Sequence, residues 1–390
     1  MMSIQSKREL LAAVAPRYRT ARGTDKQRIL DEFLASTGYH RKYAIQLLNH
    51  PPKARQRQKR RRNRRYGPDV QYALVKIWRV ANCICAKRLV PALGEFIDAL
   101  ERHAELQLDP QVKSLLLSMS VATAHRLLRS ERHQRRGLAT TKPGTLLKRS
   151  IPVRTFADWD DARPGFLEAD LVAHCGTSTS GEYLHTLTLT DVTTTWTVCL
   201  PLLNRSQQAV KTAIDRARTR LPFPMLGLDS DNGSEFINAN LLRYCRQEQI
   251  TFTRSRPYKK NDQAHVEQKN GSIVRQFVGY DRYEGREAYQ RLDALYLVLH
   301  PYVNFFQPVM KLVSKERVGN KVKKQYDTAK TPYQRTLESD QVSDEVKQRL
   351  RKEYESLNPA ALLRTIESRQ DALWQHARVR FTNETTNAAE

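Results

Sequence analysis

The chain of 390 residues contains no run of about eighteen apolar residues, so no segment is expected to span a membrane. Its first residues, MMSIQSKRELLAAVAPRYR, lack the long apolar core of a signal peptide and predict a soluble helix. Only five cysteines occur, an odd number without paired spacing, which fits free thiols in a reducing cytosol. Cys83 and Cys85 form a Cys-x-Cys, but no second pair completes a zinc site.

Acidic residues are scarce in the first part of the chain. Residues 1–150 carry 32 Lys/Arg against 11 Asp/Glu, a net of +21, whereas residues 151–390 carry 34 against 30, a net of +4. This asymmetry predicts a basic arm that binds an anion, joined to a domain with another task. Hydrophobic residues make up 40% of the chain, which is enough for packed interiors. The length predicts two or three domains.

Residues 1–50 are predicted to form a helix-turn-helix unit. Apolar residues recur at helical spacing in KRELLAAVAPRYR and in KQRILDEFLASTGYHRKYAIQLLNH, with a break at Thr37-Gly38. The helix after such a break enters the major groove of DNA and makes contacts through its N-terminal end. The candidate contacts here are Tyr39, His40, Arg41 and Lys42. A three-helix bundle with a charged face is the alternative.

A basic linker is predicted over residues 51–67. Nine of the thirteen residues from 53 to 65 are basic and none is acidic, so the segment repels itself and cannot form a core. On duplex DNA it would displace condensed counterions and bind tightly, without sequence preference. Its candidate DNA contacts are Arg60, Arg61, Arg62, Arg64 and Arg65. A solvated or targeting run is the alternative.

Residues 68–136 are predicted to form a second helical, DNA-binding domain. One long helix or two shorter ones are expected first, with Pro91 near a break. SLLLSMSVATAHRLLRSERHQRR then resembles another helix-turn-helix, in which Ser120 opens a helix rich in arginine. Arg126 and Arg129 are its candidate DNA contacts. Residues 137–157, rich in Gly, Pro and Thr, are expected to be a connector.

Residues 158–310 show a different pattern. Strands and helices are expected in the order β, β, β, α, β, α, β, α, which implies a mixed sheet with helices on its faces. A hairpin is expected at residues 191–193, and Ser206 is expected to open the first helix. Residues 311–390 are expected to be a mainly helical extension, with helices capped by Ser343 and Asn358.

Three acids lie in different predicted elements of this region. Asp170 is in the first strand, Asp231 ends a later strand, and Glu267 is on the helix after the last strand. Thirty-five residues separate Asp231 from Glu267. Converging carboxylates suit hard cations such as Mg²⁺, and a pair of such ions activates and stabilises the oxygens of a phosphodiester. The three acids are therefore a candidate metal site.

This arrangement resembles the D,D-35-E catalytic domain of retroviral integrases and related bacterial insertion-sequence transposases. The resemblance rests on LEADLVAHCG, LDSDNGSEF and RPYKKNDQAHVEQKNGSIVR, and it covers about residues 160–310. It implies an α/β RNase H-like core, a mixed five-stranded sheet flanked by helices, with two Mg²⁺ or Mn²⁺ ions per active site. Asp170 would bridge both ions, Asp231 would bind one above the turn at Asn232-Gly233, and Glu267 would bind the other.

The same resemblance implies a DNA transposase that nicks transposon ends and joins the 3′-hydroxyl to target DNA by transesterification. Its partners would be double-stranded DNA and further copies of itself, in the bacterial cytoplasm at the nucleoid. Two features depart from the family. No His/Cys zinc unit precedes the core, and Asn261-Asp262 stands where many relatives have Asn-Gly.

Several neighbours of the three acids are open to two interpretations. Lys259, Lys260, Lys269 and Arg275 could contact phosphates or form a solvated basic face. Asp229 could replace Asp231 as a ligand. Glu168 could support the site or be a solvated edge residue, and His174 could orient water or make a structural hydrogen bond. Glu235 is expected at the surface, and His265 is not expected to be a ligand.

Two other functions are compatible with these residues. A DNA-binding regulator could use the RNase H-like domain as an inactive scaffold, although the presence of all three acids argues against it. A nuclease of the same fold could act on RNA–DNA hybrids. The two helix-turn-helix candidates favour duplex DNA instead.

Overall fold

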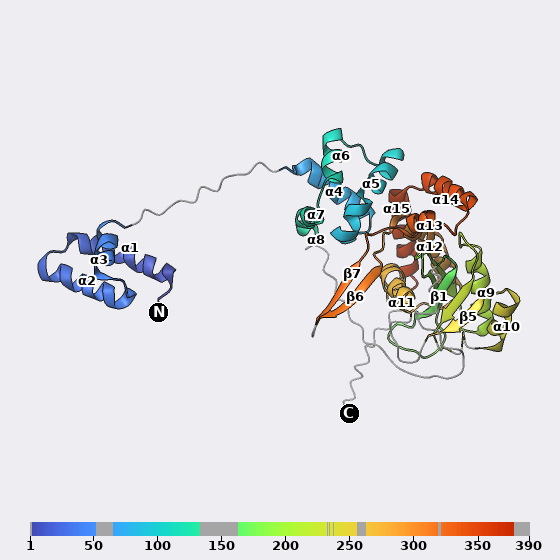
Figure 1. The fold of residues 1–390 in the computed structure, drawn as a ribbon. Helices are drawn as coiled ribbons and strands as arrows, with labels where there is room; N and C mark the ends of the chain where they lie inside the picture. Colours follow the sequence, from blue (N-terminus) through green and yellow to red (C-terminus); the bar gives the residue numbers. More distant parts are fainter. Residues whose placement is uncertain are drawn as a thin grey trace, which may run out of the picture. The chain divides into compact units, whose positions relative to one another are not determined.

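The computed structural model describes residues 2–51, 65–132, 163–318 and 321–377, apart from residues 232, 234, 237 and 256–262. The chain divides into two compact units, Met1–Arg65 and Tyr66–Glu390 (Figure 1). No helix in the described parts of the chain is both long enough and apolar enough to cross a membrane.

The first unit is a three-helix bundle made of α1 (Ile4–Thr20), α2 (Gly23–Thr37) and α3 (Arg41–Asn49). The predicted break is present, because α2 ends at Gly38 with a φ of 67° in the left-handed region that glycine favours. The bundle has its own apolar core, formed by Leu11, Ala15, Tyr18, Ile29, Leu30, Phe33, Ala44 and Leu48. It therefore folds around contacts that its own helices supply.

The second unit begins with a group of helices. These are α4 (Pro68–Val80), α5 (Ala86–Arg102), α6 (Pro110–Leu117), α7 (Val121–Leu127) and α8 (Arg129–Arg132). The break expected near Pro91 was wrong, because Pro91 lies inside α5. The chain turns earlier, where Asn82 and Cys83 have φ values of 56° and 58°. Ser120 caps α7 as predicted and accepts a hydrogen bond from the Thr123 N–H at 3.2 Å.

These helices do not stand apart from the rest of the second unit. The Tyr302 hydroxyl donates to the carbonyl oxygen of Val80 at 2.7 Å, and Arg364 pairs with Glu105 at 2.6 Å. Apolar side chains of α4 and α5 join the same core as the sheet. Residues 66–132 therefore pack within one compact unit with the region that follows, which differs from the separate domain expected for residues 68–136.

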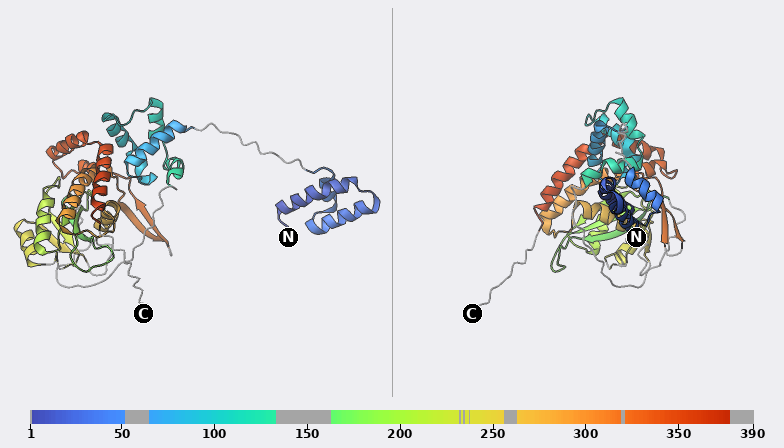
Figure 2. Two further views of the ribbon diagram at one scale, coloured as in Figure 1. Left: turned by 180° about the vertical axis from the view of Figure 1, so that it is seen from behind. Right: turned by 90° about the vertical axis from the view of Figure 1, so that its left-hand side faces the viewer.

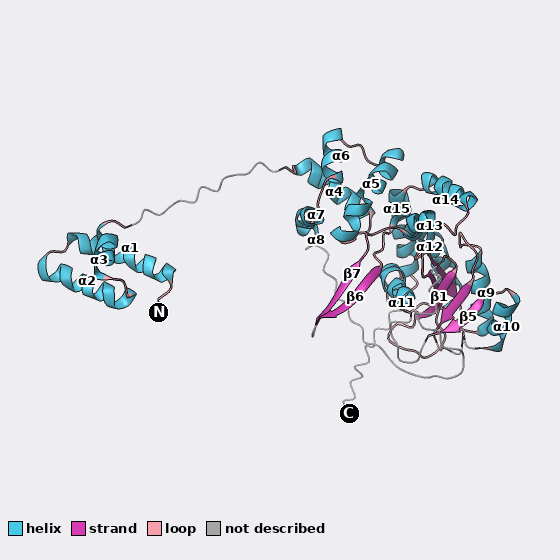
Figure 3. Cartoon of the chain, in the orientation of Figure 1, coloured by secondary structure: helices cyan, strands magenta, loops and turns pink. Residues whose placement is uncertain are grey.

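A mixed five-stranded sheet forms the centre of the second unit, as predicted (Figure 3). Its strand order is β3-β2-β1-β4-β5, in which β1 pairs antiparallel with β2 and parallel with β4. The strands and their connecting helices are β1 (Phe166–Ala173), β2 (His185–Asp191), β3 (Thr197–Leu202), α9 (Gln207–Arg218), β4 (Gly227–Ser230), α10 (Ala239–Gln247) and β5 (Thr251–Arg254). The expected order of elements and the cap at Ser206 are confirmed.

The two faces of the sheet differ in polarity. Alternation along β1 and β2 puts Leu167, Leu187 and Leu189 on one face, all fully buried. The other face carries Glu168, Asp170 and threonines, and it is covered by α11 (Ala264–Lys269) and α12 (Gly285–Phe306). A short π-helix, η2 (Asn270–Arg275), continues α11 and was not expected. The predicted acids thus lie on a polar face beneath helices.

The C-terminal part is only partly as expected. Helices α13 (Pro332–Glu338), α14 (Asp344–Ser356) and α15 (Pro359–Trp374) are present, and Ser343 and Asn358 cap the last two as predicted. The expectation that residues 311–390 are mainly helical was wrong for residues 312–326. These form a hairpin of β6 (Leu312–Val318) and β7 (Lys321–Tyr326), seen in orange in Figure 2.

Asn304 satisfies the backbone of the edge strand β3. Its fully buried side chain accepts from the Thr197 N–H at 2.8 Å and donates to the Thr197 carbonyl oxygen at 2.9 Å. Replacing Asn304 with Ala leaves both backbone groups unsatisfied, so we expect the free energy of unfolding to fall by roughly 2–4 kcal/mol. Urea denaturation followed by tryptophan fluorescence measures this change.

Leu297→Ala is the matched control, because Leu297 lies on the same helix and is 54% exposed. We expect that change to stay within about 0.5 kcal/mol of the wild type. Equal effects of the two substitutions would show that Asn304 does not hold the edge strand.

Candidate active site

The backbone register brings Asp170 and Asp231 to neighbouring positions. In the parallel pair of β1 and β4, Glu168 lies opposite Asp229, and Ala169 lies opposite Ser230. Asp170 and Asp231 are the next residues along the two strands. Both side chains are half-buried. The sheet therefore holds two carboxylates side by side at the point where β4 ends.

Glu267 approaches these acids from α11, where its side chain is exposed. The pKa of Asp170 is raised to about 7, chiefly by burial, then by the charge of Asp231 and further by that of Glu267. Hydrogen bonds from Val266 to Glu168 and from Asn270 to Asp170 hold the helix of Glu267 against β1. The helix of the third acid therefore packs on the strand that carries the first.

Among the described residues, three hydrogen bonds reach the side chains of Asp170 and Asp231. The Leu171 N–H donates to Oδ1 of Asp170 at 2.8 Å, and Nδ2 of Asn270 donates to its Oδ2 at 2.6 Å. The Gly233 N–H donates to Oδ1 of Asp231 at 3.0 Å. Oδ1 of Asn270 is buried and has no hydrogen-bond partner among the described residues. A hard cation would suit this set of oxygens.

Asn270 was not predicted as a site residue. It stands three residues after Glu267, and residues three apart share a face of a helix. That spacing was the only sign in the sequence that Asn270 could face the acids. The spacing rule holds for an α-helix, whereas the structure has a π-helix from Asn270 onward.

Glu235 lies closer to the acids than expected. It was predicted to be a surface residue, yet it is half-buried and its charge contributes to the raised pKa of Asp231, after burial. A Cβ atom on Gly233 would lie 2.7 Å from Cδ of Glu235, so a larger residue there would require the flexible Glu235 side chain to move.

A second acid pair lies deeper in the same face. Glu168 is 2% exposed, so it is not a solvated edge residue, and burial raises its pKa to about 8. Its Oε2 accepts from the Val266 N–H at 2.9 Å, which ties β1 to the residue before Glu267. Oδ1 of Asp229 accepts from the Thr253 hydroxyl at 2.7 Å. These bonds position the strands and helix that carry the three acids.

His174 has a structural environment. It is fully buried, and its Nε2 lies 2.7 Å from the Thr186 hydroxyl, which in turn lies 2.6 Å from the Tyr296 hydroxyl. Burial and the charge of Arg275 lower its pKa to about 3, so the ring is neutral. Of the two roles considered for His174, the structural hydrogen bond is the one observed.

The basic residues near Glu267 are not all at the surface. Lys269 is 3% exposed, and burial followed by the charge of Arg88 lowers its pKa to about 7. The solvated or phosphate-binding surface position expected for Lys269 is therefore wrong. Arg275 donates to the Ala173 carbonyl oxygen at 3.2 Å and lies over the Tyr280 ring at 4.8 Å. Lys259 and Lys260 lie outside the described residues.

The DNA contacts predicted elsewhere in the chain differ in their exposure to solvent. His40, Arg41 and Lys42 are exposed at the start of α3, where Arg41 pairs with Asp31 at 3.1 Å. Tyr39 is half-buried, with Nζ of Lys7 4.7 Å from the centre of its ring. Further along the chain, the exposed candidates are Arg65, Arg126 and Arg129. Arg60, Arg61, Arg62 and Arg64 fall outside the described residues.

The three acids do not yet form a closed metal site. In the described part of the chain, no three His, Cys, Asp or Glu side chains are arranged to hold one ion as they stand. Asp170, Asp231 and Glu267 interact electrostatically, so they would have to draw together around a cation. The residue types fit Mg²⁺, which prefers carboxylate and other oxygen ligands.

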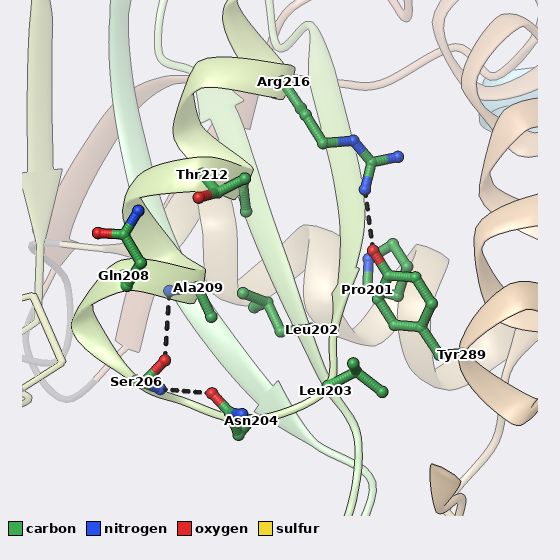
Figure 4. Close-up of a pocket in the computed structure, with 11 residues that line it drawn as sticks. Pro201, Leu202, Leu203, Asn204, Ser206, Gln208, Ala209, Thr212, Arg216 and Tyr289 are labelled. Carbon is green, nitrogen blue, oxygen red and sulfur yellow. Dashed lines mark hydrogen bonds between the residues drawn. The ribbon is translucent and has the colours of Figure 1, made fainter. Parts of the chain in front are cut away.

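A separate pocket of about 330 Å³ lies at the edge of the sheet, between β3 and α9 (Figure 4). Arg216 lines it and donates to the Tyr289 hydroxyl at 3.0 Å and to Asp293 at 2.9 Å. None of the three predicted acids lines this pocket. The chemistry of the acids is therefore confined to the polar face of the sheet.

Comparisons with known proteins agree with this architecture. Residues 160–260 match the family model described as Integrase core domain. The chain is 46% identical over 340 residues to "Uncharacterized protein y4rM" of Sinorhizobium fredii (strain NBRC 101917 / NGR234). That alignment covers 86% of this chain and 96% of the relative.

Solved integrases show a more distant likeness. The HTLV-2 integrase catalytic core domain in complex with magnesium is 17% identical, with a TM-score of 0.24. That match covers 30% of this chain and 70% of the HTLV-2 chain. The catalytic core domain of BIV integrase is 18% identical, with a TM-score of 0.29, and the match covers 44% of this chain and 91% of the BIV chain. TM-scores this low leave the fold assignment to the strand order and the family match.

The raised pKa of Asp170 predicts a pH-dependent cost to stability. The folded protein binds this proton more tightly than the unfolded chain, so stability falls as the pH rises from about 4 towards 7. Asp170→Asn removes the cost. In metal-free buffer, we expect its gain in unfolding free energy over the wild type to be roughly 2 kcal/mol larger at pH 8 than at pH 5.

Asp371→Asn, on the exposed side of α15, serves as the control, with no pH-dependent gain expected. Denaturant titrations of the three proteins at both pH values give the comparison. A gain for Asp170→Asn that is the same at pH 5 and pH 8 would mean that its carboxyl titrates normally.

Proposed function

We propose that this chain, which belongs to the integrase-like family, is a DNA transposase that nicks transposon ends and joins the exposed 3′-hydroxyl to target DNA. An integrase core domain supports a polynucleotidyl-transferase-like role. The observation that carries the finer proposal is electrostatic. Asp231 and Glu267, from separate elements, both raise the pKa of Asp170 within that core.

Asp170, Asp231 and Glu267 would hold Mg²⁺ or Mn²⁺, two ions per active site. When bound, such ions activate the attacking oxygen and stabilise the leaving oxygen of an in-line displacement. Asp170, whose pKa both other acids raise, would bridge the ions, as the family resemblance implies. Asn270, bonded to Asp170, and Glu168, bonded to the backbone beside Glu267, would fix the directions of these ligands. No protein nucleophile is needed.

DNA binding would come from the basic first 150 residues. The exposed start of α3 and the exposed arginines of α7 and α8 would contact duplex DNA, with the basic linker on its phosphates. The joining of two transposon ends implies two or more copies of the chain on DNA. The protein would act in the bacterial cytoplasm at the nucleoid.

A DNA-binding regulator with an inactive RNase H-like domain is the second candidate. It is favoured by the absence, among the described residues, of a three-ligand group already arranged for a metal ion. The two functions differ in one product. A chain that binds duplex DNA in Mn²⁺ but never yields joined strands would be such a regulator.

Glu267→Gln keeps the size of the side chain and removes its charge. We expect metal-dependent strand transfer to fall by more than about 100-fold, because even outer-shell partners of metal ligands contribute roughly 10–100-fold. Binding of duplex DNA should be unchanged. A strand-transfer assay with oligonucleotide ends in Mn²⁺, paired with a gel-shift assay, measures both.

Glu345→Gln on α14 is the matched control, because Glu345 is exposed on a helix of the same unit. Its activity should equal that of the wild type. Wild-type levels of strand transfer by the Glu267 variant would rule out the proposed triad.

A further inference from the structure

The hairpin of β6 and β7, here called the basic ribbon, projects from the second unit (Figures 1 and 2). Every side chain that the structure describes between Leu312 and Tyr326 is exposed, and Val313 is 65% exposed. A two-stranded hairpin alone is at best marginally stable in water. A projecting ribbon of this kind is therefore suited to a partner that covers it.

The charge of the basic ribbon is strongly positive. Residues 312–326 carry five Lys/Arg and one acidic residue, a net of +4, which equals the net charge of the whole of residues 151–390. Lys323 and Lys324 are adjacent on β7 and both are exposed, so both charges are open to a partner. The chemistry of the ribbon thus matches a polyanionic partner.

The root of the ribbon is fixed to the body of the unit. The Lys311 N–H donates to Oδ1 of Asp327 at 2.6 Å, and the Asp327 N–H donates to the Lys311 carbonyl oxygen at 3.0 Å. Arg335 pairs with Asp327 at 2.7 Å. Nζ of Lys311 donates to the Thr193 carbonyl oxygen at 3.0 Å, in the turn between β2 and β3. These bonds hold the start of the ribbon in a set position against the sheet.

The same root lies near the helix of Glu267. Lys311 is bonded to the turn that follows β2. Strand β2 packs against α11, the helix that carries Glu267. A partner that follows the ribbon to its root therefore arrives at the helix that carries the third acid.

We propose that the basic ribbon binds the phosphate backbone of duplex DNA and guides that DNA to the three acids. This inference rests on the proposed function, since it presumes that duplex DNA is the substrate. A strand of seven residues spans about 20 Å, and a two-stranded ribbon fits a DNA groove about 12 Å wide. Contacts to phosphates make the binding independent of sequence.

A second copy of the chain is a less suitable partner. The outer edges of a hairpin can pair with another strand, but lysines on an edge oppose such pairing. Lys323 and Lys324 are both exposed on β7. Two ribbons that each carry a net charge of +4 would repel one another. Charge complementarity therefore favours DNA.

Lys323→Gln/Lys324→Gln in the full-length chain tests the ribbon. Fluorescence anisotropy with a random-sequence duplex gives the affinity at several salt concentrations. We expect the slope of log affinity against log salt to become shallower by about 2, because each lost phosphate contact removes roughly 0.9. The affinity itself should fall on the order of tenfold at 0.1 M salt. Lys323→Arg/Lys324→Arg retains the charge and should retain the slope.

Lys347→Gln/Lys352→Gln on α14 removes the same charge elsewhere in the unit and is the matched control. It should leave the slope unchanged. If the ribbon variant and this control shift the slope equally, the ribbon makes no particular contact and the inference is wrong. A change in sedimentation mass without a change in slope would assign the ribbon to contacts between copies, and would overturn the inference as well.

Different results contradict the proposed function and the proposed role of the ribbon. A wild-type chain that binds no duplex DNA contradicts both. A wild-type chain that binds duplex and transfers strands, with a ribbon variant that binds equally well, contradicts the ribbon alone. A shallower salt slope in the ribbon variant, together with unaltered strand transfer by Glu267→Gln, supports the role of the ribbon in DNA binding. The same pair of results contradicts the catalytic role of the three acids.

Discussion

The register between β1 and β4 is the constraint on which the candidate site depends. It sets Glu168 opposite Asp229, and it brings the next acids on that face, Asp170 and Asp231, to adjacent positions. A slip of one residue would turn one of these acids toward the apolar face. The leucines of the opposite face, buried beneath other elements, prevent that slip. The apolar core therefore maintains the position of the carboxylates.

This arrangement works against stability. Burial raises the pKa of both Asp170 and Asp231. The charges of Asp231 and Glu267 raise that of Asp170 further, and the charge of Glu235 raises that of Asp231. Sites that bind cations commonly hold like charges in this way, because the ligand supplies the missing compensation. Glu168 and Asn270 add rigidity by bonding to the helix backbone and to Asp170. The cost of the acidic face is consistent with a function that needs it.

Much of the fold could be predicted from local patterns. Short-range chemistry determines the order of strands and helices along the chain and the left-handed end of α2. It also determines the helix caps, which are Ser120, Ser206, Ser343 and Asn358. The helix break predicted near Pro91 was wrong, because a proline is tolerated where tertiary packing supports the helix around it. The hairpin of residues 312–326 was missed because its many lysines obscure the strand alternation.

The site was predictable in its acids and less so in their surroundings. The spacing of Asp170, Asp231 and Glu267 identified three residues that the structure brings within electrostatic reach. Burial depends on contacts between distant segments, so the sequence could not place Lys269 inside the protein beside Arg88. The half-buried position of Glu235 and the bond from Asn270 likewise depend on tertiary geometry.

Titration calorimetry with Mn²⁺ tests the central claim, that these three carboxylates form one divalent-metal site. The account predicts that the wild-type chain binds Mn²⁺ and releases protons near pH 6.5, because Asp170 still holds much of its proton there. Asp231→Asn should weaken that binding strongly. A wild-type chain that binds no Mn²⁺, or an Asp231 variant that binds it equally tightly, would contradict the account.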